Sequence, residues 1–135
     1  MNNVEIHKKA REVFEKYPVD LAYLFGSQVT GAVHRTSDVD IAVLFDVALS
    51  KEERFEFRLA LMGELARALG IQTDVVVIND TASLFFKYVI IKEGQNMYER
   101  TPDLRVDFES RAMSLYFDFA PFLEEYNRAY VQRNI

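Results

Sequence analysis

Two aspartates stand at the start of the most apolar strand in the chain, and they limit what the chain can fold into. Residues 38–45 read Asp-Val-Asp-Ile-Ala-Val-Leu-Phe. Side chains alternate across a strand, so Asp38 and Asp40 project from the same face. Burying two carboxylates together is unfavourable unless something offsets their charge. They either lie in a solvated turn before the strand or hold a divalent cation, since Mg²⁺ prefers carboxylate and phosphate oxygens.

The spacing of apolar and polar residues around this strand predicts an α/β (α+β) domain. Its expected elements are helices at 3–17, 50–69, 82–93 and from 102 onward, and strands at 20–25, 38–45, 72–78 and 95–99. Ser50 and Glu53 form a capping box, and Gly70 ends the helix that follows it. This order predicts a small mixed β-sheet with helices packed on it. It leaves open whether the first two strands pair antiparallel.

The chain has 135 residues, a formal net charge of −5 and no cysteine. The length predicts one domain, 1–135, with a core at about 18–100 and a helical C-terminal segment at about 102–135. Without cysteine, disulfides and cysteine-ligated zinc are excluded. The negative charge does not suit a nucleic-acid partner. With no bilayer-spanning apolar run and no secretory signal, we expect a cytoplasmic protein that has no membrane partner.

A glycine-serine pair and a third aspartate add to the functional interpretation. Gly26 and Ser27 follow the first strand directly. Glycine lets a phosphate approach the main chain, and serine adds a hydroxyl donor. Asp74 lies within the third strand, where a carboxylate needs a partner. That partner is either an arginine of the preceding helix, Arg58 or Arg67, or a cation shared with the first two aspartates.

Taken together, Gly26-Ser27, ten further residues, Asp38 with Asp40, and the later Asp74 resemble the signature of the polymerase-beta-like nucleotidyltransferases. The resemblance implies a nucleotidyltransferase fold and ATP as substrate. It implies that Gly26 and Ser27 hold the β- and γ-phosphates, and that Asp38 and Asp40 bind Mg²⁺. Asp74 would complete the metal site, which is expected to hold two ions, and would help to deprotonate the attacking hydroxyl. Two ions can stabilise the attacking and leaving oxygens of an in-line displacement.

The loop between the two motifs departs from the family pattern. Relatives often carry an arginine directly after the serine, whereas this chain has Gln28 there. Arg35 is the one basic side chain, histidine aside, between Gly26 and Asp38, so it either contacts the phosphates or lies in solvent. His34 beside it is interpreted as a loop residue rather than a base.

Within this superfamily the chain is similar to the minimal nucleotidyltransferases, especially the MntA-like antitoxins. That resemblance covers nearly the full length and includes a tail with Tyr116, Phe117 and Phe119. It implies an adenylyltransferase that moves AMP from ATP to a tyrosine hydroxyl of a cognate HEPN-family RNase toxin, HepT, and so neutralises it. The implied assembly is a hetero-oligomer.

An apolar stripe on the last helix points independently to a partner. Its members recur at three- and four-residue spacing: Leu104, Phe108, Ala112, Leu115, Phe119, Phe122, Tyr126 and Ala129. We expect 102–118 to pack on the chain's own sheet. Pro121 is expected to kink or break the helix near Phe117, and residues 121–135 are expected to dock on the partner.

Two other functions remain open from the sequence. The same fold could neutralise a toxin by binding alone, without catalysis. It could also transfer a nucleotide to a small-molecule hydroxyl, as aminoglycoside nucleotidyltransferases do, although those proteins are generally longer. Polymerase activity is disfavoured because the chain is acidic and lacks a basic groove.

Overall fold

The structure is a computed structural model of the chain that describes residues 2–25 and 39–133. Within those residues a four-stranded sheet forms in the order β3-β2-β1-β4. Its strands are β1 (Val19–Phe25), β2 (Val39–Phe45), β3 (Thr73–Val77) and β4 (Gln95–Glu99). β1 is antiparallel to both β2 and β4, whereas β2 and β3 are parallel. The predicted mixed sheet is therefore confirmed, and the first two strands pair antiparallel.

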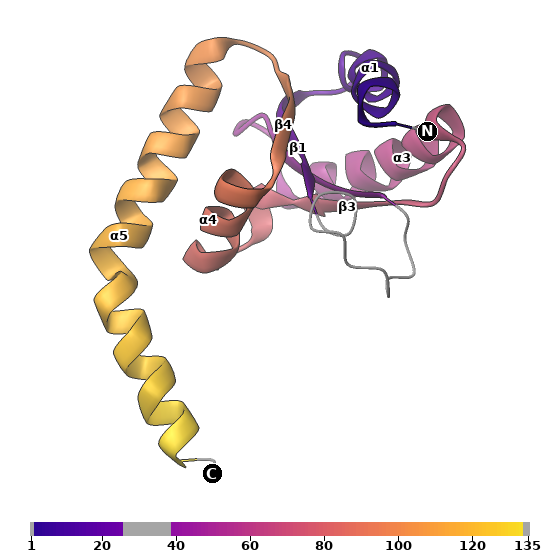
Figure 1. The fold of residues 1–135 in the computed structure, drawn as a ribbon. Coiled ribbons are helices and arrows are strands. Elements are labelled where there is room, and N and C mark those ends of the chain that lie inside the picture. The colour runs from indigo at the N-terminus through magenta and orange to yellow at the C-terminus, as the bar shows by residue number, and fades with distance from the viewer. Residues whose placement is uncertain (1, 26–38, 134–135) are drawn as a thin grey trace.

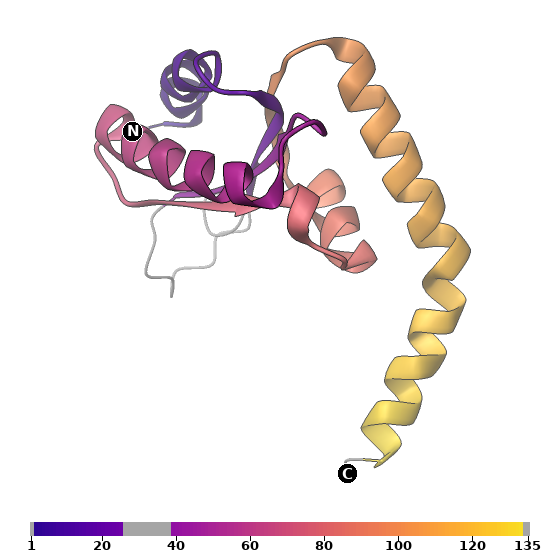
Figure 2. The ribbon, with the colours of Figure 1, turned by 180° about the vertical axis from the view of Figure 1, so that it is seen from behind.

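Helices cover both faces of this sheet (Figures 1 and 2). On one face lie α1 (Asn3–Phe14) and α3 (Lys51–Leu69), and on the other lie α4 (Leu84–Glu93) and α5 (Pro102–Arg133). A short 3-10 helix, η1 (Ile78–Asp80), follows β3. The alternation of side chains along β2 explains the two layers, because Ile41 faces the α1/α3 side and Ala42 faces the α4/α5 side.

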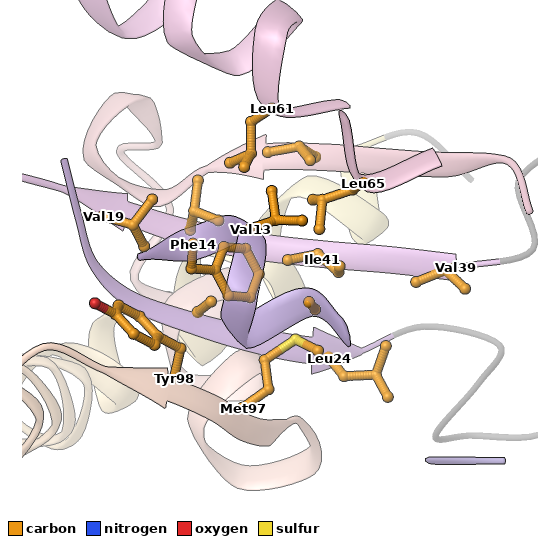
Figure 3. Close-up of a cluster of buried hydrophobic side chains, with 14 of the residues drawn as sticks. Val13, Phe14, Val19, Leu24, Val39, Ile41, Leu61, Leu65, Met97 and Tyr98 are labelled. Atoms are coloured by element: carbon orange, nitrogen blue, oxygen red, sulfur yellow. The ribbon is translucent and has the colours of Figure 1, made fainter. Parts of the chain in front are cut away.

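The larger apolar core fills the space between the sheet and α1/α3 (Figure 3). Phe14 of α1, Leu65 of α3 and Ile41 of β2 meet in it and are fully buried. The smaller core joins Leu21 and Tyr23 of β1 to Ile90 of α4, with Leu104 and Phe108 of α5 packed against it. Burial of this apolar surface is the main force holding the layers together.

Local signals set the ends of α1 and α3. Ser50 and Glu53 form the predicted capping box, and Gly70 adopts the left-handed conformation, φ 72°, that ends α3. The prediction that the first helix reaches residue 17 is wrong, because α1 ends at Phe14 and a turn follows. After Phe14 the backbone tightens to i→i+3 hydrogen bonds, from Lys16 to Val13 and from Tyr17 to Phe14, and Pro18 then ends the turn.

The long helix α5 continues through Pro121 and is assigned as one helix over its 32 residues. Of the two predicted effects of Pro121, the break is wrong, and the kink near Phe117 stays a prediction. Proline removes one backbone donor, but the turns on either side keep their own hydrogen bonds. The second half of α5 extends past the sheet and away from the other helices (Figures 1 and 2). In the part of the chain that the structure describes, no helix has the length and apolar character needed to cross a bilayer.

Candidate active site

Parallel pairing of β2 and β3 places Asp40 beside Asp74. Asp40 is in register with Asp74, just as Ala42 is with Val76. Because Asp40 shares its face with Ala42, both carboxylates lie on the α4/α5 side of the sheet. On its other flank Asp40 pairs with Phe25, the last residue of β1. The row Phe25–Asp40–Asp74 therefore lies at the end of the sheet from which the chain runs directly into Gly26.

The two carboxylates differ in their surroundings. Asp40 is buried at 3% relative exposure, whereas the side chain of Asp74, on the outermost strand, is 43% exposed. Nη2 of Arg58 lies 3.4 Å from Oδ1 of Asp74, and Nε of Arg58 donates to the carbonyl oxygen of Val75 at 2.7 Å. Of the two arginines considered from sequence, Arg58 is the one that pairs with Asp74.

The end of β1 is held from the α4 side by contacts that the sequence did not reveal. The rings of Phe25 and Phe86 meet edge to face at 5.9 Å between centroids. Gly94, which follows α4, approaches so closely that a Cβ there would lie 2.4 Å from the carbonyl oxygen of Ile90 and 3.3 Å from that of Leu24. The sequence marked Gly94 only as a helix stop. These contacts orient the strand that leads into the glycine-serine pair.

A hydrogen-bonded network joins α5 to the same face of the sheet. The buried hydroxyl of Tyr23 donates to Oε2 of Glu109 at 2.6 Å. Arg105 pairs with Glu99 at 2.5 Å and with Glu109 at 3.5 Å. Burial, reinforced by the bond to Glu109, raises the pKa of the Tyr23 hydroxyl far above its usual value. Tyr23 therefore acts as a permanent donor that fixes α5 beside β1.

The remaining predicted site residues fall outside the described residues: Gly26, Ser27, Arg35 and Asp38. Within 2–25 and 39–133, no three histidine or acidic side chains come close enough together to hold a metal ion. Asp40 and Asp74 nevertheless fit a hard divalent cation, because neighbouring strands present two carboxylates on one face. The third predicted ligand, Asp38, is two residues before Asp40 in the sequence.

Comparison with known protein families shows to which family this fold belongs. The family described as "Polymerase beta, Nucleotidyltransferase" matches residues 8–103, which include all four strands. The chain belongs to the polymerase beta nucleotidyltransferase family. This membership confirms the resemblance seen in the motifs and the fold expected from it. The chain is thus a nucleotidyltransferase.

Individual relatives narrow the group within this nucleotidyltransferase family. The chain is 32% identical to protein adenylyltransferase MntA of Shewanella oneidensis, over 86% of this chain and 78% of that protein. It is 26% identical to protein adenylyltransferase MntA of Aphanizomenon flos-aquae, over 81% and 77% of the two chains. Among solved structures, one described as a toxin–antitoxin with AMP-PNP aligns with a TM-score of 0.67 at 27% identity, over 94% and 96% of the two chains. The chain therefore belongs with the MntA-type members of the family.

Proposed function

We propose that this nucleotidyltransferase is an antitoxin that transfers AMP from ATP to a tyrosine hydroxyl of a cognate HEPN-family toxin, HepT. In that step the hydroxyl oxygen bonds to the α-phosphorus, the bond to the β-phosphate bridging oxygen breaks, and pyrophosphate leaves. The hydroxyl proton passes to a carboxylate or to water. The observation that carries the proposal is the pairing of Asp40 with Asp74 at the end of the sheet, in a chain similar to proteins named protein adenylyltransferase.

Each site residue has a role in this proposal. Asp40 and Asp74, joined by Asp38, hold Mg²⁺, and Asp74 helps to take up the proton of the attacking hydroxyl. Gly26, Ser27 and Arg35 contact the phosphates of ATP. When bound, Mg²⁺ supplies positive charge against the phosphate oxygens and favours ionisation of the hydroxyl. The chain's own task is positioning, since nucleotidyl transfer needs little covalent help from a protein.

The shape of α5 supports a protein as the acceptor. The apolar stripe of α5 starts with residues that pack on the body of the protein, Phe108 and Ala112. It continues with three residues that are exposed: Leu115, Phe119 and Phe122. Singly exposed apolar residues are ordinary, but a row of them on a projecting helix is typical of an interaction surface. A protein docked along this row would lie on the α4/α5 side of the sheet, the face that carries Asp40 and Asp74.

The transfer can be tested with α-labelled ATP and Mg²⁺, with and without the candidate toxin. We expect label and a mass gain of AMP units on the toxin only when both proteins are present. The double variant Asp38→Asn/Asp40→Asn should lose the transfer, because the charge that holds the cation is gone. Label on neither protein with the wild-type chain would overturn the proposal.

Neutralisation by binding alone is the second candidate, and the exposed row on α5 favours it because docking needs no chemistry. Gln28, which stands where relatives often carry an arginine, also favours binding without catalysis. The two candidates separate in cells that express the toxin. A catalytically inactive Asp38→Asn/Asp40→Asn variant protects those cells if binding suffices and leaves them unprotected if AMP transfer is needed.

A further inference from the structure

The side chain of Arg58 reaches around the outer edge of the sheet, from the face that carries α3 to the opposite face. The residue belongs to α3, which packs on the α1/α3 side, whereas Asp74 projects from the α4/α5 side. β3 is the end strand of the sheet order, so its outer backbone is open to such an approach. The guanidinium donates from Nε to the carbonyl oxygen of Val75 at 2.7 Å. That short bond fixes the group beside the carboxylate row.

The second contact of Arg58 is weaker than the first. Nη2 lies 3.4 Å from a single oxygen of Asp74, and the two side chains are 31% and 43% exposed. Ion pairs this open to solvent contribute little and exchange readily. Arginine stays charged at any ordinary pH, so the positive charge at this edge is permanent. The bond to Val75 therefore holds the guanidinium of Arg58 in place, while its contact with the carboxylate of Asp74 can break and re-form.

The carboxylate of Asp40 lies next to that of Asp74, so a positive charge beside Asp74 affects both groups. Adjacent strands lie about 4.8 Å apart, so Asp74 and its register partner Asp40 are close like charges. From this geometry we infer that Arg58 is a positioning residue that balances Asp74 in the metal-free protein and competes with the incoming divalent cation for that carboxylate. The inference rests on the metal site of the proposed function and adds a residue that sets how tightly that site binds its ion.

The test is metal affinity, measured without ATP or toxin. Mn²⁺ alone serves as the probe, and its free concentration is followed by electron paramagnetic resonance. Arg58→Gln removes the competing charge, so we expect Mn²⁺ to bind about three- to tenfold more tightly than to the wild-type chain. Arg67→Gln, which removes the same charge from an exposed position on the same helix, should leave the affinity unchanged.

Two further variants separate the charge of Arg58 from the rest of its side chain and from its partner Asp74. Arg58→Lys retains the charge and should bind Mn²⁺ as the wild type does. Adding Asp74→Asn to Arg58→Gln should abolish the gain, because the contested carboxylate is then absent. An unchanged or weaker affinity in Arg58→Gln would assign Arg58 a purely structural role at the edge of β3, and a wild-type chain that binds no Mn²⁺ would also overturn the inference. Failure of the proposed function is a separate result, the absence of AMP transfer by the wild-type chain.

Discussion

At the scale of single residues, one hydroxyl joins the sheet to the long helix. Tyr23 is 1% exposed, and its bond to Glu109 links β1 directly to α5. Burial is the larger cause of its raised pKa, and the hydrogen bond to Glu109 adds to it. The hydroxyl therefore stays protonated and able to donate at neutral pH. The contact is short and charge-assisted, which places it among the stronger hydrogen bonds in proteins.

Replacing this tyrosine should destabilise the protein. Tyr23→Phe removes the donor and leaves Glu109 without it, so we expect a loss of about 1.5–3 kcal/mol in the free energy of unfolding. Urea unfolding followed by circular dichroism measures the change. Tyr17→Phe is the matched control, because its bond to Glu64 is longer, 3.4 Å, and should cost less than about 1 kcal/mol. Equal losses in the two variants would contradict the importance given to Tyr23.

At the scale of elements, two glycines of the α3 segment should respond oppositely to the same substitution. Gly63 lies inside the helix, and a Cβ there would meet Nη1 of Arg67 at an ordinary 3.6 Å. Gly63→Ala should therefore stabilise the protein by about 0.5–1 kcal/mol. Gly70 has φ 72°, so Gly70→Ala should destabilise it by about 1–2 kcal/mol although the Cβ meets nothing. Thermal or urea unfolding measures both, and the same sign for both changes would refute the argument.

The link between α3 and η1 should be sensitive to pH. Arg54 reaches Asp80 with Nη2 2.6 Å from Oδ1, and this hydrogen bond is the main reason that the pKa of Asp80 is lowered. A carboxyl whose folded pKa is lowered stabilises the fold above its unfolded value, about 3.9, and loses that effect as pH falls through the lower folded value. Asp80→Asn should therefore unfold at a lower temperature than the wild type at pH 7, and the difference should shrink at acid pH, as pH falls below the unfolded value.

A control for that experiment comes from an ion pair on the surface. Asp107→Asn breaks a contact with Arg111 in which both side chains are about 70% exposed, and such pairs add little stability. Its midpoint should follow the wild type at both pH values. A difference between Asp80→Asn and the wild type that persisted unchanged at acid pH would show that the lost contact acts through packing rather than charge.

The elements that the sequence predicted well are those with local chemical signals. Ser50, Glu53 and Gly70 act within a turn of the helix ends they mark, so the helix predicted at 50–69 agrees with the observed α3 to within one residue. Pairing between strands depends on the whole sheet, and the antiparallel pairing of β1 with β2 could not be derived from either segment alone. The position of Asp74 on the face of Asp40 follows from register between β2 and β3. The packing of Phe86 on Phe25 depends on where α4 settles, and no local pattern encodes that.

At the scale of the whole molecule, α5 has one half that is packed and one half that projects. Among the described residues, its last ring contacts with the body are those of Tyr116 and Phe117 with Tyr88 of α4, with ring centroids 4.1 and 6.0 Å apart. Before that point Ala112 is 6% exposed, and after it Phe119 and Phe122 are 48% and 67% exposed. The sequence indicated a continuous stripe, but the position where the body stops covering it became visible only in the fold (Figure 1).

The projecting half gives the last prediction, which concerns assembly. The double variant Phe119→Ser/Phe122→Ser should remove the aromatic anchors and weaken binding to the toxin about thirtyfold or more, as loss of central interface residues does. Deleting residues 121–135 should abolish the complex. Size-exclusion chromatography and calorimetric titration measure binding, and circular dichroism checks that each variant is folded. Phe55→Ser, which changes an equally exposed phenylalanine on α3, should bind normally. Wild-type affinity in the double variant would exclude the stripe as the docking surface and place the toxin against another part of the molecule.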